Sequence, residues 1–139
     1  MSRINKYRGM HIHVHPQNEH LNGTWIYGHL SDENYINSLD LEGEFLVDKD
    51  TVGQYIGVDD KNGKEVYEGD IVRQYADCTE FGKNLYLFYV MEWSEEYCAF
   101  VGREICSNET YLMPDLKDIE VIGNVYENAD LVKEVEISE

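Results

Sequence analysis

Basic residues are scarce in this chain. Eleven Lys and Arg residues stand against 28 Asp and Glu residues among 139 positions, which gives a formal net charge of −17. Proteins bind DNA and RNA largely by bringing Lys and Arg to phosphate groups, and this sequence contains no run of either residue. We therefore expect no direct nucleic-acid binding, and we expect the acidic groups to form a solvated surface.

Cysteine and long apolar segments are also scarce. The three cysteines are odd in number and include no Cys-x-x-Cys pair, which argues against a disulfide framework and for reduced thiols. Cys98 falls in a predicted strand, where we expect a thiol packed in the core. The longest apolar run, residues 85–91, is too short to span a bilayer. The polar N-terminus lacks the apolar segment of a signal peptide. The sequence thus predicts a cytoplasmic protein without a membrane partner.

Motifs for a catalytic nucleophile or a phosphate-binding loop are missing. The chain has neither Gly-x-Ser-x-Gly nor the glycine-rich Lys-Ser/Thr loop of nucleotide-binding proteins. We accordingly predict no catalytic residue, no cofactor and no cofactor-binding residue.

The hydrophobic pattern predicts a mainly β protein. Short β-favouring segments alternate with turn residues, and the last residues resemble a helix preceded by a capping residue. The predicted strands are residues 6–16, 24–30, 44–47, 52–58, 65–67, 85–93, 97–105 and 119–126, with a further strand entered at residues 71–72. Ser31 is a candidate cap for a further short helix. We expect one domain over residues 1–139, a small barrel-like or sandwich β domain with short helical segments. Lobes at 1–48 and 52–126 are an alternative, with 127–139 as a short helix and acidic tail.

Small and turn-forming residues mark the bends between these strands. Asn62 and Gly63 are expected to take the positive φ angles of a tight hairpin. Asp70 is expected to accept backbone N–H groups at a second bend, and a glycine in the last strand predicts either a bulge or a close approach of the backbone. The residues of this structural signature are Gly57, Asn62, Gly63, Gly69, Asp70 and Gly123.

Three histidines alternate along the first predicted strand. His11, His13 and His15 would point to one face, and His-x-His on a strand can start a zinc site. The alternative is a polar face, with Ile12 and Val14 packed inward. We favour the polar face and predict no metal, but the three histidines remain the candidate ligands.

Aromatic side chains gather in the hairpin predicted from residues 85–105. They are Tyr86, Phe88, Tyr89, Trp93 and Tyr97. Their spacing distributes them over both faces of the hairpin. Only one face packs inward, so the other is expected to form a protein interface.

Three blocks of sequence carry a family resemblance. Residues 52–72 read VGQYIGVDDKNGKEVYEGDIV, residues 119–128 read IEVIGNVYEN, and KYRG at 6–9 is followed by WIYGHL at 25–30. These blocks, and their order along the chain, resemble the YopX family, small proteins of phages and prophages of Gram-positive bacteria. The resemblance implies a YopX-like domain and no established biochemical activity.

The resemblance and the missing motifs together lead to one expectation about function. We expect a non-enzymatic phage or prophage accessory protein in the cytoplasm of a bacterial host cell. It would bind protein, either itself as a homo-oligomer or a host or phage protein. Two alternatives stay open. One is a metal-binding protein or metal-dependent enzyme that uses His11, His13 and His15. The other is an acidic decoy for a host nucleic-acid-binding protein.

Overall fold

The chain is divided into two compact units, which are described separately. A computed structural model describes residues 6–12, 23–78, 83–112 and 118–137. The first unit is Met1–Gly57 and the second is Val58–Glu139. The division falls within a strand, whereas the lobes considered from the sequence would separate between residues 48 and 52.

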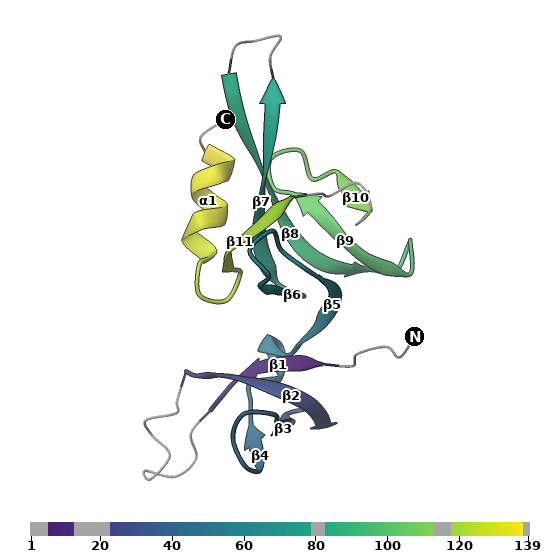
Figure 1. The fold of residues 1–139 in the computed structure, drawn as a ribbon, viewed down its shortest axis with the longest axis vertical. Helices are drawn as coiled ribbons and strands as arrows, with labels where there is room; N and C mark the ends of the chain where they lie inside the picture. Colours follow the sequence, from purple (N-terminus) through teal and green to yellow (C-terminus); the bar gives the residue numbers. More distant parts are fainter. Residues whose placement is uncertain (1–5, 13–22, 79–82, 113–117, 138–139) are drawn as a thin grey trace. The chain divides into compact units, whose positions relative to one another are not determined.

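Five strands and one turn of 3-10 helix account for the regular structure that begins in the first unit. The strands are β1 (Tyr7–Met10), β2 (Trp25–Asp32), β3 (Tyr35–Ser38), β4 (Glu44–Leu46) and β5 (Gly53–Asp59), and the 3-10 turn is Lys49–Thr51. They form an antiparallel sheet in the order β4-β3-β2-β1-β5, which continues to β6 (Glu65–Tyr67). The N-terminal strand β1 therefore lies inside the sheet, between β2 and β5 (Figure 1).

The first unit packs around three buried aliphatic side chains. Ile26, Ile36 and Val47 form this core, and Phe45 and Val52 are among the half-buried residues packed on it. The helix that Ser31 was expected to cap is absent from the described residues of this region. The strand β2 instead runs on to Asp32, whose carboxylate accepts the N–H of Glu33 at 2.7 Å and favours a tight turn into β3.

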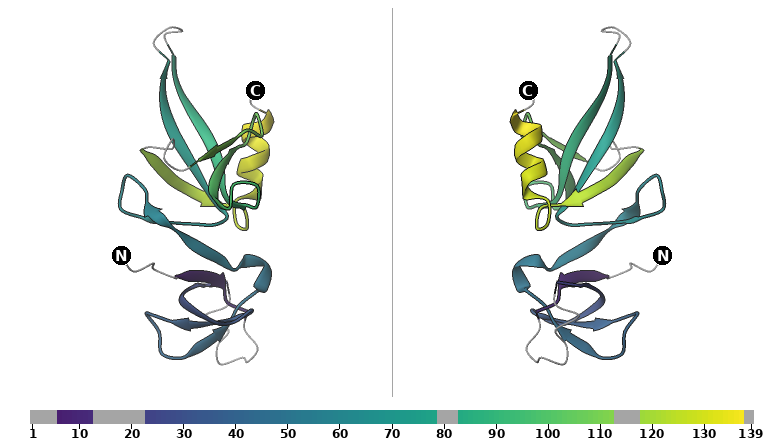
Figure 2. Two further views of the ribbon diagram at one scale, coloured as in Figure 1. Left: turned by 90° about the vertical axis from the view of Figure 1, so that its right-hand side faces the viewer. Right: turned by 90° about the vertical axis from the view of Figure 1, so that its left-hand side faces the viewer.

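A second antiparallel sheet dominates the C-terminal unit. Its strands are β7 (Asp70–Cys78), β8 (Lys83–Ser94), β9 (Ala99–Glu104), β10 (Thr110–Leu112) and β11 (Ile119–Asn124), in the order β10-β9-β8-β7-β11. The helix α1 (Ala129–Ile137) follows β11 and lies beside the sheet (Figures 1 and 2). Within the described ranges, no helix is both long and apolar enough to span a membrane.

Both faces of this sheet are buried near its centre. Ile71 and Val72 follow each other on β7, so their side chains point to opposite faces, yet both are 0 % exposed. On one face, Ile71 packs with Val90 and with Leu131 of α1. Each aliphatic side chain buried in this way contributes about 1.5–3 kcal/mol to folding.

The observed architecture confirms the predicted fold class. Within the described ranges the protein is mainly β, with two antiparallel sheets and one α-helix. Several local predictions differ from the structure. The strands β3 and β10 were not predicted, β7 extends six residues past Val72 to Cys78, and α1 reaches Ile137 rather than ending near Lys133. In each case, tertiary pairing or packing supports a segment whose own pattern is weak.

Replacement of Ile71 by alanine tests the helix-covered core. We expect Ile71→Ala to lower the free energy of unfolding by about 2–5 kcal/mol, because a rigidly enclosed cavity remains. Leu39 is an exposed side chain in the loop before β4, and Leu39→Ala should change stability by less than about 0.5 kcal/mol. Urea unfolding followed by circular dichroism measures both variants. Equal losses for the two would contradict this description of the core.

Candidate functional site

One buried carboxylate connects the turn between β5 and β6 to the edge strand β11. The Oδ1 atom of Asp60 accepts the backbone N–H groups of Asn62 at 2.9 Å and Lys64 at 2.8 Å. Its Oδ2 atom accepts the N–H of Val121 at 3.0 Å. A single side chain therefore orders the turn and fixes it to a strand that lies about sixty positions later in the chain.

These three donors set the protonation of the Asp60 carboxyl group. Burial by itself would raise the pKa of Asp60. The backbone N–H groups of Val121, Lys64 and Asn62, together with the charge of Lys64, outweigh burial and hold the pKa below its ordinary value of 3.8. Asp60 is thus an anion near neutral pH, and its negative charge strengthens all three hydrogen bonds.

The bend before β7 requires a glycine for two independent reasons. Gly69 has a φ of 92°, which side chains with a Cβ rarely adopt. A Cβ there would also approach the ring of Tyr126 to 2.8 Å. The backbone of Gly69 bonds on both sides, since its N–H donates to the oxygen of Met91 at 2.7 Å and its oxygen accepts from Val125 at 2.9 Å. This bend therefore fixes β8 and the end of β11 relative to each other.

Asp70 and Gly123 complete the same corner. The Oδ2 atom of the buried Asp70 accepts the N–H of Tyr67 at 2.8 Å. The register of β11 against β7 shifts between Val121 and Gly123, which forms the bulge expected at this glycine. A Cβ on Gly123 would lie 2.5 Å from the Oδ1 atom of Asn128, so the bulge leaves room for that side chain.

The hairpin turn itself differs from the predicted conformation. In the turn, Gly63 has a φ of 83°. Gly57, which lies before the turn within β5, has a φ of 92°. Asn62 does not have a positive φ, so the expectation that Asn62 and Gly63 both take this conformation is wrong. The N–H of Gly63 donates to the oxygen of Asp60 at 3.0 Å. The turn therefore has the three-residue form that needs one left-handed residue, whereas the two-residue form needs two.

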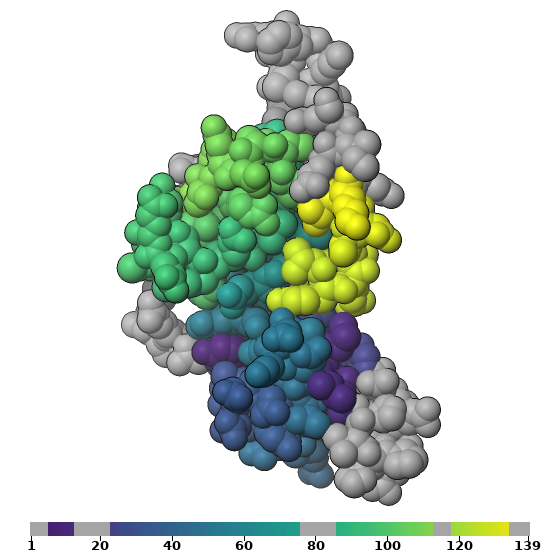
Figure 3. Space-filling model, turned by 180° about the vertical axis from the view of Figure 1, so that it is seen from behind, coloured from purple at the N-terminus to yellow at the C-terminus, as the bar shows by residue number. Residues whose placement is uncertain are grey.

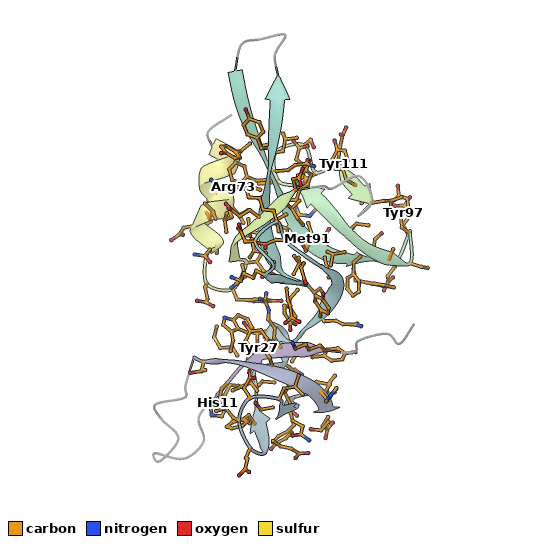
Figure 4. The ribbon with its side chains drawn as sticks, viewed as in Figure 1. His11, Tyr27, Arg73, Met91, Tyr97 and Tyr111 are labelled. Carbon is orange, nitrogen blue, oxygen red and sulfur yellow. The ribbon has the colours of Figure 1, made fainter. Side chains whose placement is uncertain are left out.

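Next to this turn, Glu120 gathers several donors. Its carboxylate accepts from Arg73 at 2.7 Å and from the Asn62 side chain at 3.2 Å, and Lys61 lies at 3.8 Å. The Asn62 hydrogen bond and the Arg73 contacts lower the pKa of Glu120, so the group is a poor general base. The Arg73 guanidinium also lies 4.6 Å from the ring centroid of Tyr86 (Figure 4). Sequence reasoning did not find this cluster, because its members are distant in the chain.

The first candidate metal ligand is enclosed in the N-terminal unit. His11 is 5 % exposed, and its Nδ1 lies 2.7 Å from the carbonyl oxygen of Leu46, so Nδ1 carries the proton and donates. The ring packs edge-on against Phe45 at 5.5 Å (Figure 4). Ile12 is 42 % exposed. The expected inward packing of Ile12 is therefore wrong. The hydrogen bond to Leu46 satisfies Nδ1, whereas Nε2 is buried without a hydrogen-bond partner among the described residues, which carries a cost in free energy.

The other two candidate ligands, His13 and His15, lie outside the described residues, as does Val14. Among the positions that the structure describes, no group of three or more His, Cys, Asp or Glu side chains is arranged to hold a metal ion. The metal hypothesis therefore stays a prediction.

Aromatic side chains lie on both faces of the β7–β8–β9 sheet. Phe88 packs against the core beside α1, whereas Tyr89 points to the opposite face and is buried. Tyr86, Trp93 and Tyr97 are exposed. Cys98 is also exposed, with a φ of 50° in the turn after β8. The expectation of a packed core thiol at Cys98 is therefore wrong, because the strand β9 begins only at Ala99.

Comparison with protein families identifies the chain. A family model described as YopX protein matches residues 6–133. The chain belongs to the YopX family. A search of curated proteins finds no match.

Two of the three blocks that resemble the YopX family come together in the C-terminal unit, whereas the block at residues 6–9 and 25–30 lies in the first unit. Residues 58–72 contain both turns described above, and residues 119–128 contain the strand and bulge to which these turns are bonded. The Asp60–Val121 and Gly69–Val125 bonds join the two blocks directly. These two blocks therefore build the framework of the unit.

Replacement of Asp60 by asparagine tests the connection between the blocks. An amide cannot accept three N–H groups with the same strength, and we expect Asp60→Asn to lose about 1–3 kcal/mol of stability at pH 7. Because the folded-state pKa lies below the unfolded value, this stabilisation is complete above about pH 4 and is lost as the pH falls through the folded value. The difference between wild type and variant should therefore shrink below about pH 4.

Asp118 offers a matched control for the change of charge. It is exposed in the turn before β11 and has a φ of 57°, a conformation that asparagine also tolerates. Asp118→Asn should leave stability within about 0.5 kcal/mol of wild type. Chemical unfolding across a pH series measures both variants. A constant difference between Asp60→Asn and wild type at all pH values would contradict the role of the ionised carboxylate.

Proposed function

We propose that this YopX-family protein is a non-enzymatic phage or prophage accessory protein that acts by binding protein, including a second copy of itself. The observation that supports binding most directly is the set of large apolar side chains on the surface. In the C-terminal unit, exposed members are Tyr75, Tyr86, Trp93, Tyr97, Leu112 and Tyr126. Exposed aromatic groups of this kind are typical of the centres of protein interfaces.

The sheet edges offer a route to self-association. The order of the second sheet ends at β10, which pairs with β9 and carries the exposed Leu112. An edge strand presents backbone N–H and C=O groups that can pair with another chain. The strand is short, which limits such pairing to few hydrogen bonds, so an apolar contact must contribute. We therefore assign the edge at β10 as the first surface to test for self-association.

Net charge makes self-association dependent on salt. Each copy carries a formal charge of −17, so two copies repel each other at long range. Screening extends over about 30 Å at 0.01 M salt and about 8 Å at 0.15 M salt. Self-association should therefore strengthen as the salt concentration rises.

Native mass spectrometry and analytical ultracentrifugation test this proposal. We expect a discrete multiple of the 16.2 kDa chain, with a larger oligomeric fraction at physiological than at low salt. Leu112→Glu should reduce the oligomeric fraction by about tenfold or more, since a carboxylate would be buried at the contact. Leu39→Glu makes the same change at an exposed loop of the N-terminal unit and should have little effect. A monomer at all concentrations and salts would refute self-association.

A further inference from the structure

Along one face of β8, the side chains change from buried to exposed. Tyr89, Met91 and Trp93 alternate along the strand and therefore share a face. Tyr89 and Met91 are buried, whereas Trp93 is 47 % exposed. The face that carries Tyr89 and Met91 thus continues past the part that the described residues cover. A large aromatic side chain at such a position presents apolar area to a partner at little entropic cost.

One aromatic neighbour contacts Trp93 at the end of the β8–β9 hairpin. Phe100 lies directly opposite Trp93 in the register, and the two rings meet edge to face with centroids 5.1 Å apart. Tyr97 lies in the connecting turn and is 49 % exposed (Figure 4). Figure 3 shows this end of the hairpin at the margin of the C-terminal unit, in green at the left. The arrangement is a preorganised aromatic surface.

The charges around these rings are negative. Glu95 and Glu96 lie in the same turn and are exposed, and within the described part of the chain neither belongs to an ion pair. Together with Trp93, Tyr97 and Phe100 they form what we call the Trp93 surface.

Arg103, the basic residue of β9, lies on the other side of the sheet. It pairs with Val90, whose side chain points to the helix-covered face, and its Nε lies 3.2 Å from Glu92. The positive charge of Arg103 therefore points away from the Trp93 surface, and on the opposite face it is paired with the carboxylate of Glu92.

Two tyrosines farther along the same face, Tyr89 and Tyr111, also lie near carboxylates. Burial, and after it the charge of Glu104, raises the pKa of Tyr89 to about 12. A hydrogen bond to Glu109 raises the pKa of Tyr111. The rings of Tyr89 and Tyr111 are 5.6 Å apart (Figure 4). Carboxylates therefore also lie beside this part of the aromatic face.

We propose that the Trp93 surface binds a segment of a partner protein that is rich in Arg or Lys. Aromatic rings bind cations through the negative charge on their faces, most strongly in the case of Trp, and Glu95 and Glu96 supply ionic attraction at the rim. A second copy is a poor occupant of this surface. A two-fold contact would bring Glu95 and Glu96 of one copy close to Glu95 and Glu96 of the other, and these four carboxylates repel one another. This inference rests on the proposed function as a binding protein and specifies the chemistry of one partner.

Titration with a short oligo-arginine peptide, followed by NMR, tests this inference on the full chain. The protein has two Trp residues, so the indole N–H spectrum reports on Trp93 and, as an internal reference, on Trp25. We expect the Trp93 signal to shift while the Trp25 signal stays in place. Trp93→Ala should raise Kd by roughly tenfold. Tyr126→Ala, which removes another exposed aromatic group of the same unit, should leave Kd within about twofold.

A matched pair of charge variants separates local recognition from general attraction to an acidic protein. Glu95→Gln/Glu96→Gln and Glu42→Gln/Glu44→Gln each remove two exposed carboxylates, the second pair from the N-terminal unit. The first pair should weaken peptide binding by about tenfold and the second by less than about twofold. Equal losses would overturn the proposal, because they would show diffuse attraction only.

Salt dependence distinguishes this inference from the proposed self-association. Peptide binding should weaken as salt rises, whereas oligomers should become more abundant. One outcome would be that the Trp93→Ala variant is monomeric and that the peptide does not bind the wild-type protein. The occupant of the Trp93 surface is then a second copy, so the inference is wrong although the proposed function stands. If the peptide binds at the Trp93 surface and no oligomer forms, the inference stands and the self-association part fails.

Discussion

The carboxylate of Asp60 is the interaction on which the C-terminal unit depends. Three backbone N–H groups, two in the turn and one in β11, converge on its two oxygen atoms. Without this acceptor, three buried or half-buried donors would lose their partner, at a cost comparable to a sizeable part of the stability of a small domain. The same contact positions β11 against β7, and β11 leads directly into α1. The helix therefore depends on it for its place over the core of Ile71.

The sheet built on this framework has two faces with different roles. The helix α1 covers one face near Ile71 and Val90. On the other face, the buried side chains of β8 end at Met91. The next side chain on that face, Trp93, is 47 % exposed among the described residues. A sheet longer than the elements packed on it leaves such an end uncovered. The proposed binding surface is thus a consequence of the length of β8, and its acidic rim follows from the composition of the following turn.

Several parts of this fold could be predicted from local patterns. Residues 52–58, 85–93 and 119–126 are rich in aliphatic and aromatic residues and are flanked by turn residues, and each corresponds to an observed strand. The bulge at Gly123 was predictable because a glycine interrupts a β-favouring segment. The helix suggested at Ser31 and the buried thiol suggested at Cys98 were wrong. At both positions the polar residues serve a hairpin turn, and short segments with weak periodicity do not distinguish turns from element ends.

Long-range contacts explain what could not be predicted at the candidate sites. The sequence shows that His11 and Ile12 point to opposite faces, but a shift of one residue exchanges the two faces. Only pairing with Val47 and the carbonyl oxygen of Leu46 decided that His11 is inside. Likewise, Arg73 and Glu120 meet because β7 pairs with β11 in one register.

The sequence by itself determined the β class, the acidic charge, the main bends and membership in the YopX family. These properties follow from composition, from the period-two pattern and from short blocks of residues. The tertiary structure alone decided which carboxylate joins the blocks, which histidine is buried and which aromatic residues remain on the surface. Those outcomes depend on strand register and on the extent of the helix, which are set by contacts between residues far apart in the chain.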